Sequence, residues 1–102
     1  MDKNIKNSPI ALFVYNRLDN TRNTIEHLKR NSLASESILY IFSDGGKDEL
    51  SWKKVQEVRS YLHTITGFKE IHIIERPKNY YLERNVTEGI AYVLERHETI
   101  IV

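Results

Sequence analysis

The sequence predicts an α/β protein of three layers, in which helices cover both faces of an open parallel sheet. Short, continuously apolar runs alternate along the chain with segments whose apolar residues recur every three or four positions. The runs are typical of strands buried on both faces, and the spaced residues mark the buried face of amphipathic helices. The connections are short, and no repeat or linker divides the 102 residues. We therefore expect one β-α-β-α-β-α-β domain with right-handed crossovers.

The first βα unit begins with an apolar run of strand length at residues 9–15. A helix follows and ends near Asn31 and Ser32, where the periodic pattern fades. Asp19 and Asn20 are the candidates for its N-cap, because their side chains accept hydrogen bonds from free amides. Its buried face consists of Leu18, Thr21, Ile25 and Leu28.

The second unit contains the apolar run at residues 38–42, which ends at Ser43-Asp44-Gly45-Gly46. Paired glycines permit a tight turn here, so Asp44 stands at the carboxyl end of the strand. Asp48 or a neighbour is expected to cap the next helix, and Gly67 is placed to follow the end of that helix. The apolar stripe of this helix consists of Trp52, Val55, Val58, Leu62 and Ile65.

The third unit starts with a strand at residues 71–74, which Pro77 stops because proline cannot donate to a ladder. The third helix follows, and residues 99–102 are expected to begin a fourth strand. The buried stripe of this helix consists of Leu82, Val86, Ile90, Val93 and His97.

Composition excludes several classes of protein. Lys and Arg number 15 against 14 Asp and Glu, which leaves a net charge of +1 without the basic face that nucleic-acid binding needs. With no cysteine, the chain has no disulfide and no thiolate zinc site, which fits a reducing, cytoplasmic location. Residues 1–8 form a polar lead-in without the apolar segment of a signal peptide, and we expect no membrane span. The histidines fall on separate elements, so we expect no metal cluster.

Ligands of parallel α/β sheets bind outside the carboxyl ends of the strands, so the segments after the strands form the candidate site. The glycine patterns of dinucleotide-binding and P-loop proteins are absent, and Asn16 and Arg17 replace the paired acids that a receiver domain has after its first strand. What remains is a cation after strand one, Arg17, an anion after strand two, Asp44, and a helix N-terminus after strand three. This set suits a nucleotide diphosphate, because arginine and free amides bind phosphate and a carboxylate accepts from a base or a ribose.

Each of these residues also has a purely structural interpretation. Arg17 is equally well explained as a solvated loop residue, and Asp44 as the residue that initiates a turn before two glycines. Asn79 is consistent with the end of a strand. Tyr80 and Tyr81 fit either core packing at the start of a helix or a stacking surface for a base.

Five segments in this order form a familiar set. They are Tyr15-Asn16-Arg17, Ser43-Asp44-Gly45-Gly46, Arg76-Pro77-Lys78-Asn79, Glu83-Arg84-Asn85 and Gly89-Ile90-Ala91. The set resembles the nucleotide-sugar-binding half of glycosyltransferases of the GT-A fold, which is Rossmann-like, and the resemblance covers nearly the whole chain. It extends to the large bacterial family 2 and to the N-acetylglucosaminyltransferase I-like group, and it implies the strand order 3-2-1-4.

The resemblance implies a UDP-sugar donor as the partner. In such enzymes the first turn and the acid after strand two hold the uracil and ribose. An Asn-x-Gly segment follows strand three, and here Tyr81 stands where the family usually has glycine. An Arg-Asn pair matches Arg84 and Asn85. The nucleotide-binding residues implied in this chain are Tyr15, Asn16, Arg17, Asp44, Gly45, Asn79 and Arg84.

The resemblance also implies what this sequence lacks. The family places an acidic metal motif directly after the fourth strand, whereas the sequence given ends at Val102, so Mn²⁺ or Mg²⁺ is expected only in a longer parent protein. We therefore expect residues 9–102 to be an N-terminal glycosyltransferase fragment that binds the donor nucleotide, holds no catalytic residue or metal ligand, and is inactive alone. The alternative is a stand-alone, non-catalytic α/β module that binds a nucleotide or a protein partner.

Two apolar surfaces predict self-association. Strand four would be an uncovered edge, which is a template for another chain, and the stripe on the third helix would be left partly bare. We therefore expect a homodimer through residues 99–102 or through the helix at residues 82–97.

Overall fold

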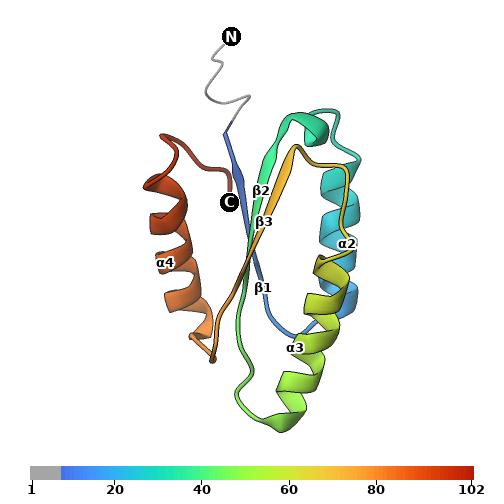
Figure 1. Cartoon of the computed structure of the whole chain (residues 1–102), viewed down its shortest axis with the longest axis vertical. Coiled ribbons are helices and arrows are strands. Elements are labelled where there is room, and N and C mark those ends of the chain that lie inside the picture. The colour runs from blue at the N-terminus through green and yellow to red at the C-terminus, as the bar shows by residue number, and fades with distance from the viewer. Residues whose placement is uncertain (1–7) are drawn as a thin grey trace.

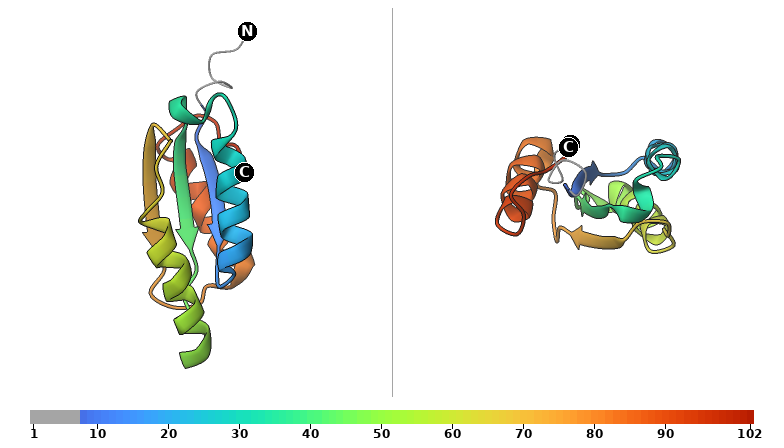
Figure 2. Two further views of the ribbon diagram at one scale, coloured as in Figure 1. Left: turned by 90° about the vertical axis from the view of Figure 1, so that its right-hand side faces the viewer. Right: turned by 90° about the horizontal axis from the view of Figure 1, so that it is seen from above.

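A computed structural model describes residues 8–102, which form a three-stranded parallel sheet with two helices on one face and one on the other (Figure 1). Figure 2 shows these three layers from the side and end on. The predicted α/β architecture is therefore confirmed. In chain order the elements are β1 (Ile10–Val14), α2 (Leu18–Lys29), the short 3-10 helix η1 (Ala34–Glu36), β2 (Ile38–Ser43), α3 (Glu49–Leu62), β3 (Glu70–Glu75) and α4 (Tyr81–Leu94).

The register of the sheet brings the carboxyl ends of all three strands to one edge. β2 lies in the middle, with β1 and β3 parallel to it on either side. Val14 of β1 is paired with Ser43 of β2, and Ser43 is paired with Glu75 of β3. The three segments that follow the strands therefore begin level with one another, as a ligand site at this edge requires.

The fourth segment takes the predicted place but does not form the predicted strand. Ala11 donates its amide to the carbonyl of Ile101 at 2.7 Å, and the Ile101 amide donates to the carbonyl of Pro9 at 2.8 Å. Ile101 thus forms an isolated parallel bridge on the side of β1 away from β2, as the order 3-2-1-4 predicts. The expectation of a strand over residues 99–102 was wrong. A ladder needs successive pairs, and here only one residue pairs.

Each face of the sheet has its own apolar core. Alternate side chains of β2 point to opposite faces, so Leu39 and Ile41 lie on one side and Tyr40 and Phe42 on the other. All four are buried, as expected for a central strand covered on both faces. On the face of α2 and α3 the buried cluster is Val14, Ile25, Leu39, Ile41, Val58 and Leu62. On the face of α4 it is Ala11, Tyr40, Phe42 and Val93.

The predicted helix starts are confirmed for α3 and wrong for α2. Asp48 caps α3 in a capping box, in which its carboxylate accepts from the Ser51 amide at 2.8 Å. This hydrogen bond to the backbone lowers the pKa of Asp48, because it stabilises the charged form. The residue before α2 is Arg17, which makes no side-chain cap bond, and Asp19 and Asn20 lie inside the first turn. Asp19 still places its negative charge at the positive end of the helix dipole.

Two predicted helix ends lie further along the chain than the observed ones. α3 ends at Leu62, so Gly67 is not the residue that follows it. Gly67 instead has a φ of 98° in the connection to β3, a left-handed conformation that suits glycine. His97 lies beyond α4, and its Nε2 is 2.8 Å from the Tyr40 hydroxyl.

Gly89 allows α4 to lie close against the sheet. A Cβ atom at this position would lie 2.6 Å from Cε1 of Phe13 and 3.1 Å from the ring of Phe42. These two rings are stacked with their centroids 5.4 Å apart, and Phe42 is fully buried. The Phe42 ring has no free space to move into, because it is fully buried and protein interiors are closely packed.

We expect Gly89→Ala to destabilise the fold although alanine is the better helix former. Overpacking costs about 1 to 3 kcal/mol, whereas the gain in helix propensity is about 1 kcal/mol. Thr87→Ala, at an exposed position of the same helix, is the control and should leave the free energy of unfolding within about 0.5 kcal/mol. Chemical denaturation measures both changes, and a more stable Gly89→Ala variant would contradict the close approach.

The expected homodimer stays a prediction, and both segments assigned to it expose apolar side chains. Leu82 of α4 is 72% exposed, and Val102 at the bridge to β1 is 70% exposed. Exposed apolar surface of this kind favours association. We expect the sedimentation mass of the chain to rise with concentration from monomer towards dimer.

Substitutions that each introduce a single charge identify which segment forms the dimer contact. Leu82→Lys should weaken association if α4 forms the contact, and Val102→Lys should do so if the bridging segment forms it. Leu50→Lys is the control, because Leu50 is 68% exposed on α3, outside both segments. A strictly monomeric mass at every concentration contradicts the prediction.

Candidate functional site

A pocket of about 550 Å³ opens at the carboxyl edge of the sheet. Its walls come from the end of β1, the start of α2, the turn after β2 and the start of α4. Leu12, Phe13, Val14 and Leu82 give it an apolar lining, beside which polar side chains from all four segments lie. A concave, mainly apolar site with a few convergent polar groups is the usual form of a small-molecule site.

Most of the predicted site residues meet in this pocket. Those that line it are Tyr15, Asn16, Arg17, Asp44 and Asn79. Gly45 is not among the lining residues, although it lies directly beside Asp44. Arg84 lies away from the pocket on the exposed surface of α4, where its guanidinium carbon is 3.7 Å from the centroid of the Tyr80 ring and its Nε bonds to Glu88.

Asp44 holds the end of β2 against the start of α4 with one of its two oxygens. Oδ1 accepts from the Gly45 amide at 2.9 Å and from the Tyr80 amide at 2.7 Å. The residue is only 4% exposed, and Oδ2 makes no hydrogen bond within residues 8–102. Asp44 therefore has the turn-forming role that the sequence left open, and it also keeps one acceptor oxygen at a pocket-lining position.

Asn79 and Gly45 join the same two loops. The Asn79 side-chain amide donates to the carbonyl of Gly45 at 2.8 Å, and its Oδ1 accepts from the Tyr81 amide at 3.1 Å. A Cβ atom on Gly45 would lie 2.5 Å from the backbone carbon of Lys78, so only glycine permits this approach. Both residues thus position the wall of the pocket between β2 and α4.

Lys47 and Tyr81 line the pocket as a pair, with the Lys47 amine 4.7 Å from the centroid of the Tyr81 ring. Lys47 is not among the site residues predicted from the sequence, although a cation directly after two glycines at a strand end is a signal for anion binding. Tyr81 has a φ of 64°, in the left-handed region that favours glycine. The conformation explains why glycine is suited to this position, where the chain has tyrosine instead.

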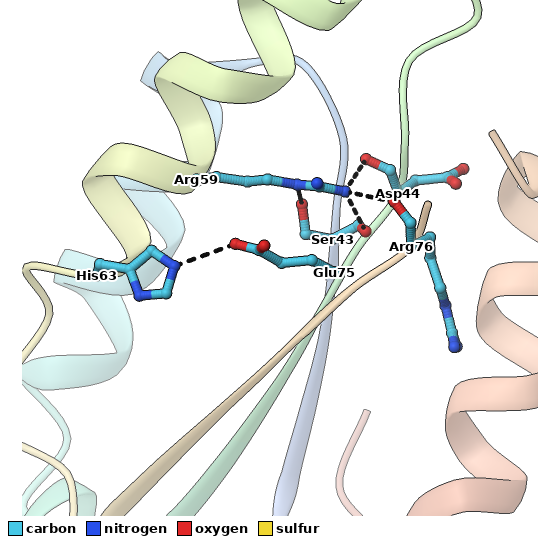
Figure 3. Close-up of polar contacts among 6 residues, drawn as sticks. All are labelled: Ser43, Asp44, Arg59, His63, Glu75 and Arg76. Carbon is cyan, nitrogen blue, oxygen red and sulfur yellow. Dashed lines mark hydrogen bonds and ion pairs between the residues drawn. The ribbon is translucent and has the colours of Figure 1, made fainter. Parts of the chain in front are cut away.

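Arg59 organises the polar contacts behind the pocket and was also missed (Figure 3). Its Nε donates to the Ser43 hydroxyl at 2.9 Å, and its Nη2 lies within 3.3 Å of the carbonyl oxygens of Ser43, Asp44 and Arg76. Burial lowers the pKa of Arg59, and the carboxylates of Glu75 and Asp44 oppose that effect. Arg59 lies four residues after Val55 and three before Leu62, so its helical position alone predicts that it faces the sheet.

Asn85 links α4 to the loop after β3. It is 2% exposed, its amide donates to the Phe42 carbonyl at 3.2 Å, and its Oδ1 accepts from Nε of Arg76 at 3.0 Å. Nη2 of Arg76 is buried and has no hydrogen-bond partner among the described residues. Of the predicted Arg-Asn pair, Asn85 is therefore the member that reaches the pocket, while Arg84 does not.

The charges of the pocket favour an anion. Arg17 and Lys47 line it beside a single carboxylate, that of Asp44. A divalent cation prefers several carboxylate oxygens, and no group of three or more His, Asp or Glu side chains within residues 8–102 could hold one. The residues present here do not fit the Mn²⁺ or Mg²⁺ that the resemblance implies for a longer protein.

No helix within residues 8–102 is long and apolar enough to cross a membrane.

We expect Tyr81→Gly to be more stable than Tyr81→Ala by about 1 kcal/mol, because glycine adopts the left-handed conformation without strain. Both variants lose the contact between the ring and Lys47, so the comparison isolates the backbone. Thermal unfolding of the two proteins measures the difference. A more stable Tyr81→Ala variant would show that the backbone at this position is not left-handed.

No curated protein and no solved structure matched the chain. A family model matched it from residue 10 to residue 102, which covers all three strands, all three helices and every residue of the pocket. The model describes family 2, one of the two groups that the sequence resembles. The chain belongs to glycosyl transferase family 2.

Proposed function

We propose that the pocket binds the nucleotide of a nucleotide-sugar donor, and that the nucleotide is a uridine diphosphate. The observation that carries the proposal is the convergence of two cations, Arg17 and Lys47, and one partly unbonded carboxylate, Asp44, on a single apolar pocket. Membership of a glycosyltransferase family supports the choice of donor. Fold alone would not, because one fold serves many functions.

Different residues of the pocket contact different parts of the nucleotide. Oδ2 of Asp44 accepts the imide N–H of uracil, which is a donor that cytosine lacks at the same ring position. Tyr15 and the apolar lining from Leu12 to Val14 lie against the flat face of the base and against the ribose. Arg17 and Lys47 bind the diphosphate, because cations form strong hydrogen bonds with phosphate oxygens.

The charges of the pocket suit donor binding and do not suit sugar transfer. Glycosyl transfer needs stabilisation of the diphosphate that leaves, which a metal ion commonly supplies. One carboxylate between two cations does not suit such an ion. We therefore propose that the 102 residues alone bind the donor without transferring its sugar.

We expect Asp44→Asn to weaken UDP binding by about 1 to 3 kcal/mol, which corresponds to roughly 5- to 150-fold in affinity. Asparagine keeps an oxygen for the Gly45 and Tyr80 amides, but it turns a donor towards the imide of uracil. The same change should favour CDP over UDP relative to the unaltered chain, since N3 of cytosine is an acceptor. Titration calorimetry with both nucleotides measures the two affinities.

Asp19→Asn is the matched control for this prediction. The Asp19 side chain is 93% exposed on α2 and does not line the pocket, so its loss of charge should leave both affinities unchanged. An equal response of the Asp44 and Asp19 variants, or no change in either, would contradict binding of the base at Asp44.

A further inference from the structure

Arg59 is a charged side chain in a buried place. It belongs to α3, is 8% exposed, and packs under Trp52, with its guanidinium carbon 5.3 Å from the ring centroid. No carboxylate lies within 4.0 Å of it among residues 8–102. Its hydrogen bonds all go to the chain segments at the carboxyl ends of β2 and β3 (Figure 3).

These bonds continue the sheet beyond its last ladder contact. The β2–β3 register ends at the pair Ser43 and Glu75, and the last backbone bond runs from the Arg76 amide to the Ser43 carbonyl at 2.9 Å. After this bond the two segments diverge, one towards α3 on one face of the sheet and the other towards α4 on the opposite face. Nη2 of Arg59 lies 2.9 Å from the Arg76 carbonyl and 3.3 Å from the Asp44 carbonyl, so one nitrogen joins the two segments where the backbone no longer does.

The position of the Asp44 carboxylate depends on both segments. Its own backbone amide donates to the Val14 carbonyl at 2.9 Å, which ties it to β1. Its Oδ1 is bonded to the Tyr80 amide, which lies four residues after Arg76. If the segments from β2 and β3 moved apart, Oδ1 would lose this partner and Oδ2 would no longer be held at the pocket.

Stability alone is a poor explanation for an arginine here. Burying a guanidinium is costly, because the charge loses its hydration, and no ion pair within residues 8–102 compensates here. Arg59, however, reaches these acceptors with two nitrogens of one rigid group, Nε to the Ser43 hydroxyl and Nη2 to the three carbonyls. Lysine carries only one nitrogen and an apolar residue carries none.

We propose that Arg59 is a positioning residue of the nucleotide site, which joins the ends of β2 and β3 so that Asp44 presents Oδ2 to the base. This inference rests on the proposed function for the identity of the ligand. It assigns to Arg59 no contact with the nucleotide, because Arg59 does not line the pocket.

A double-mutant cycle with UDP tests the inference in the full 102-residue chain. Arg59→Met should weaken binding at least about tenfold, and Arg59→Lys should restore only part of the loss, since it returns the charge without the fork. In the background of Asp44→Asn, Arg59→Met should cost less than about twofold, because its effect passes through the Asp44 carboxylate. An equal loss in both backgrounds, or no loss in either, overturns the proposal.

Arg22→Met is the matched control. Arg22 lies on α2, with its guanidinium carbon 5.4 Å from the Tyr61 ring centroid, and it does not line the pocket. It loses the same charge and the same kind of ring contact, so its UDP affinity should equal that of the unaltered chain. An equal loss for Arg22→Met and Arg59→Met would show that net charge alone is responsible, and it would overturn the proposal.

A second measurement needs no ligand and separates this inference from the proposed function. Hydrogen exchange of the Gly45 and Tyr80 amides, which donate to Oδ1 of Asp44, should become faster in Arg59→Met, while the Leu39 amide in the core should keep its protection. If Arg59→Met does not fold, Arg59→Lys serves for both measurements. Unchanged Gly45 and Tyr80 amides overturn the positioning role. If these amides exchange faster in Arg59→Met but the unaltered chain binds no UDP, the positioning role of Arg59 is retained and the proposed nucleotide binding is refuted.

Discussion

One carboxylate oxygen joins the parts of the molecule that make the pocket. Oδ1 of Asp44 accepts from two backbone amides, one in the turn after β2 and one just before α4, and it does so in a place almost closed to water. Hydrogen bonds to a charged acceptor are stronger than neutral ones, and an unpaired carboxylate there would be costly. The start of α4, the course of the loop after β3 and the width of the pocket therefore all depend on this group.

The same edge of the sheet also carries backbone strain. Tyr81 adopts a left-handed conformation at the first residue of α4, and such a conformation costs a residue with a side chain about 1 to 2 kcal/mol. Two contacts compensate for this cost. Oδ1 of Asn79 accepts a hydrogen bond from the Tyr81 amide, and the Tyr81 ring lies beside the Lys47 amine. Strain that surrounding contacts maintain is characteristic of functional sites, because it fixes a wall that a relaxed chain would not hold.

The sequence predicts what depends on local pattern. The uninterrupted apolar run of β2 indicates a central strand, and the Asp48 cap follows from the residue type before α3; both are confirmed. The convergence of Arg17 and Asp44 follows from the rule that parallel strands end at one edge. Such rules work because they require no knowledge of which side chains meet across the fold.

The rest depends on contacts between distant segments. Nothing local indicates that only Ile101 of the last segment would pair with β1. The contacts of Arg84, in contrast, are local, because Tyr80 and Glu88 lie four residues before and after it along the chain. The helical spacing of Arg59 predicts that it faces the sheet, but it does not predict its hydrogen-bond acceptors, which lie at least 15 residues away along the chain.

The two interpretations of Asp44 that the sequence leaves open, turn former and ligand, are compatible. A carboxylate has two oxygens and about four acceptor positions, so one oxygen can hold the loops while the other faces the pocket. A side chain already fixed by the fold loses little conformational entropy when a ligand binds. The structural bonds of Asp44 therefore hold in place the acceptor oxygen that we propose for binding the base.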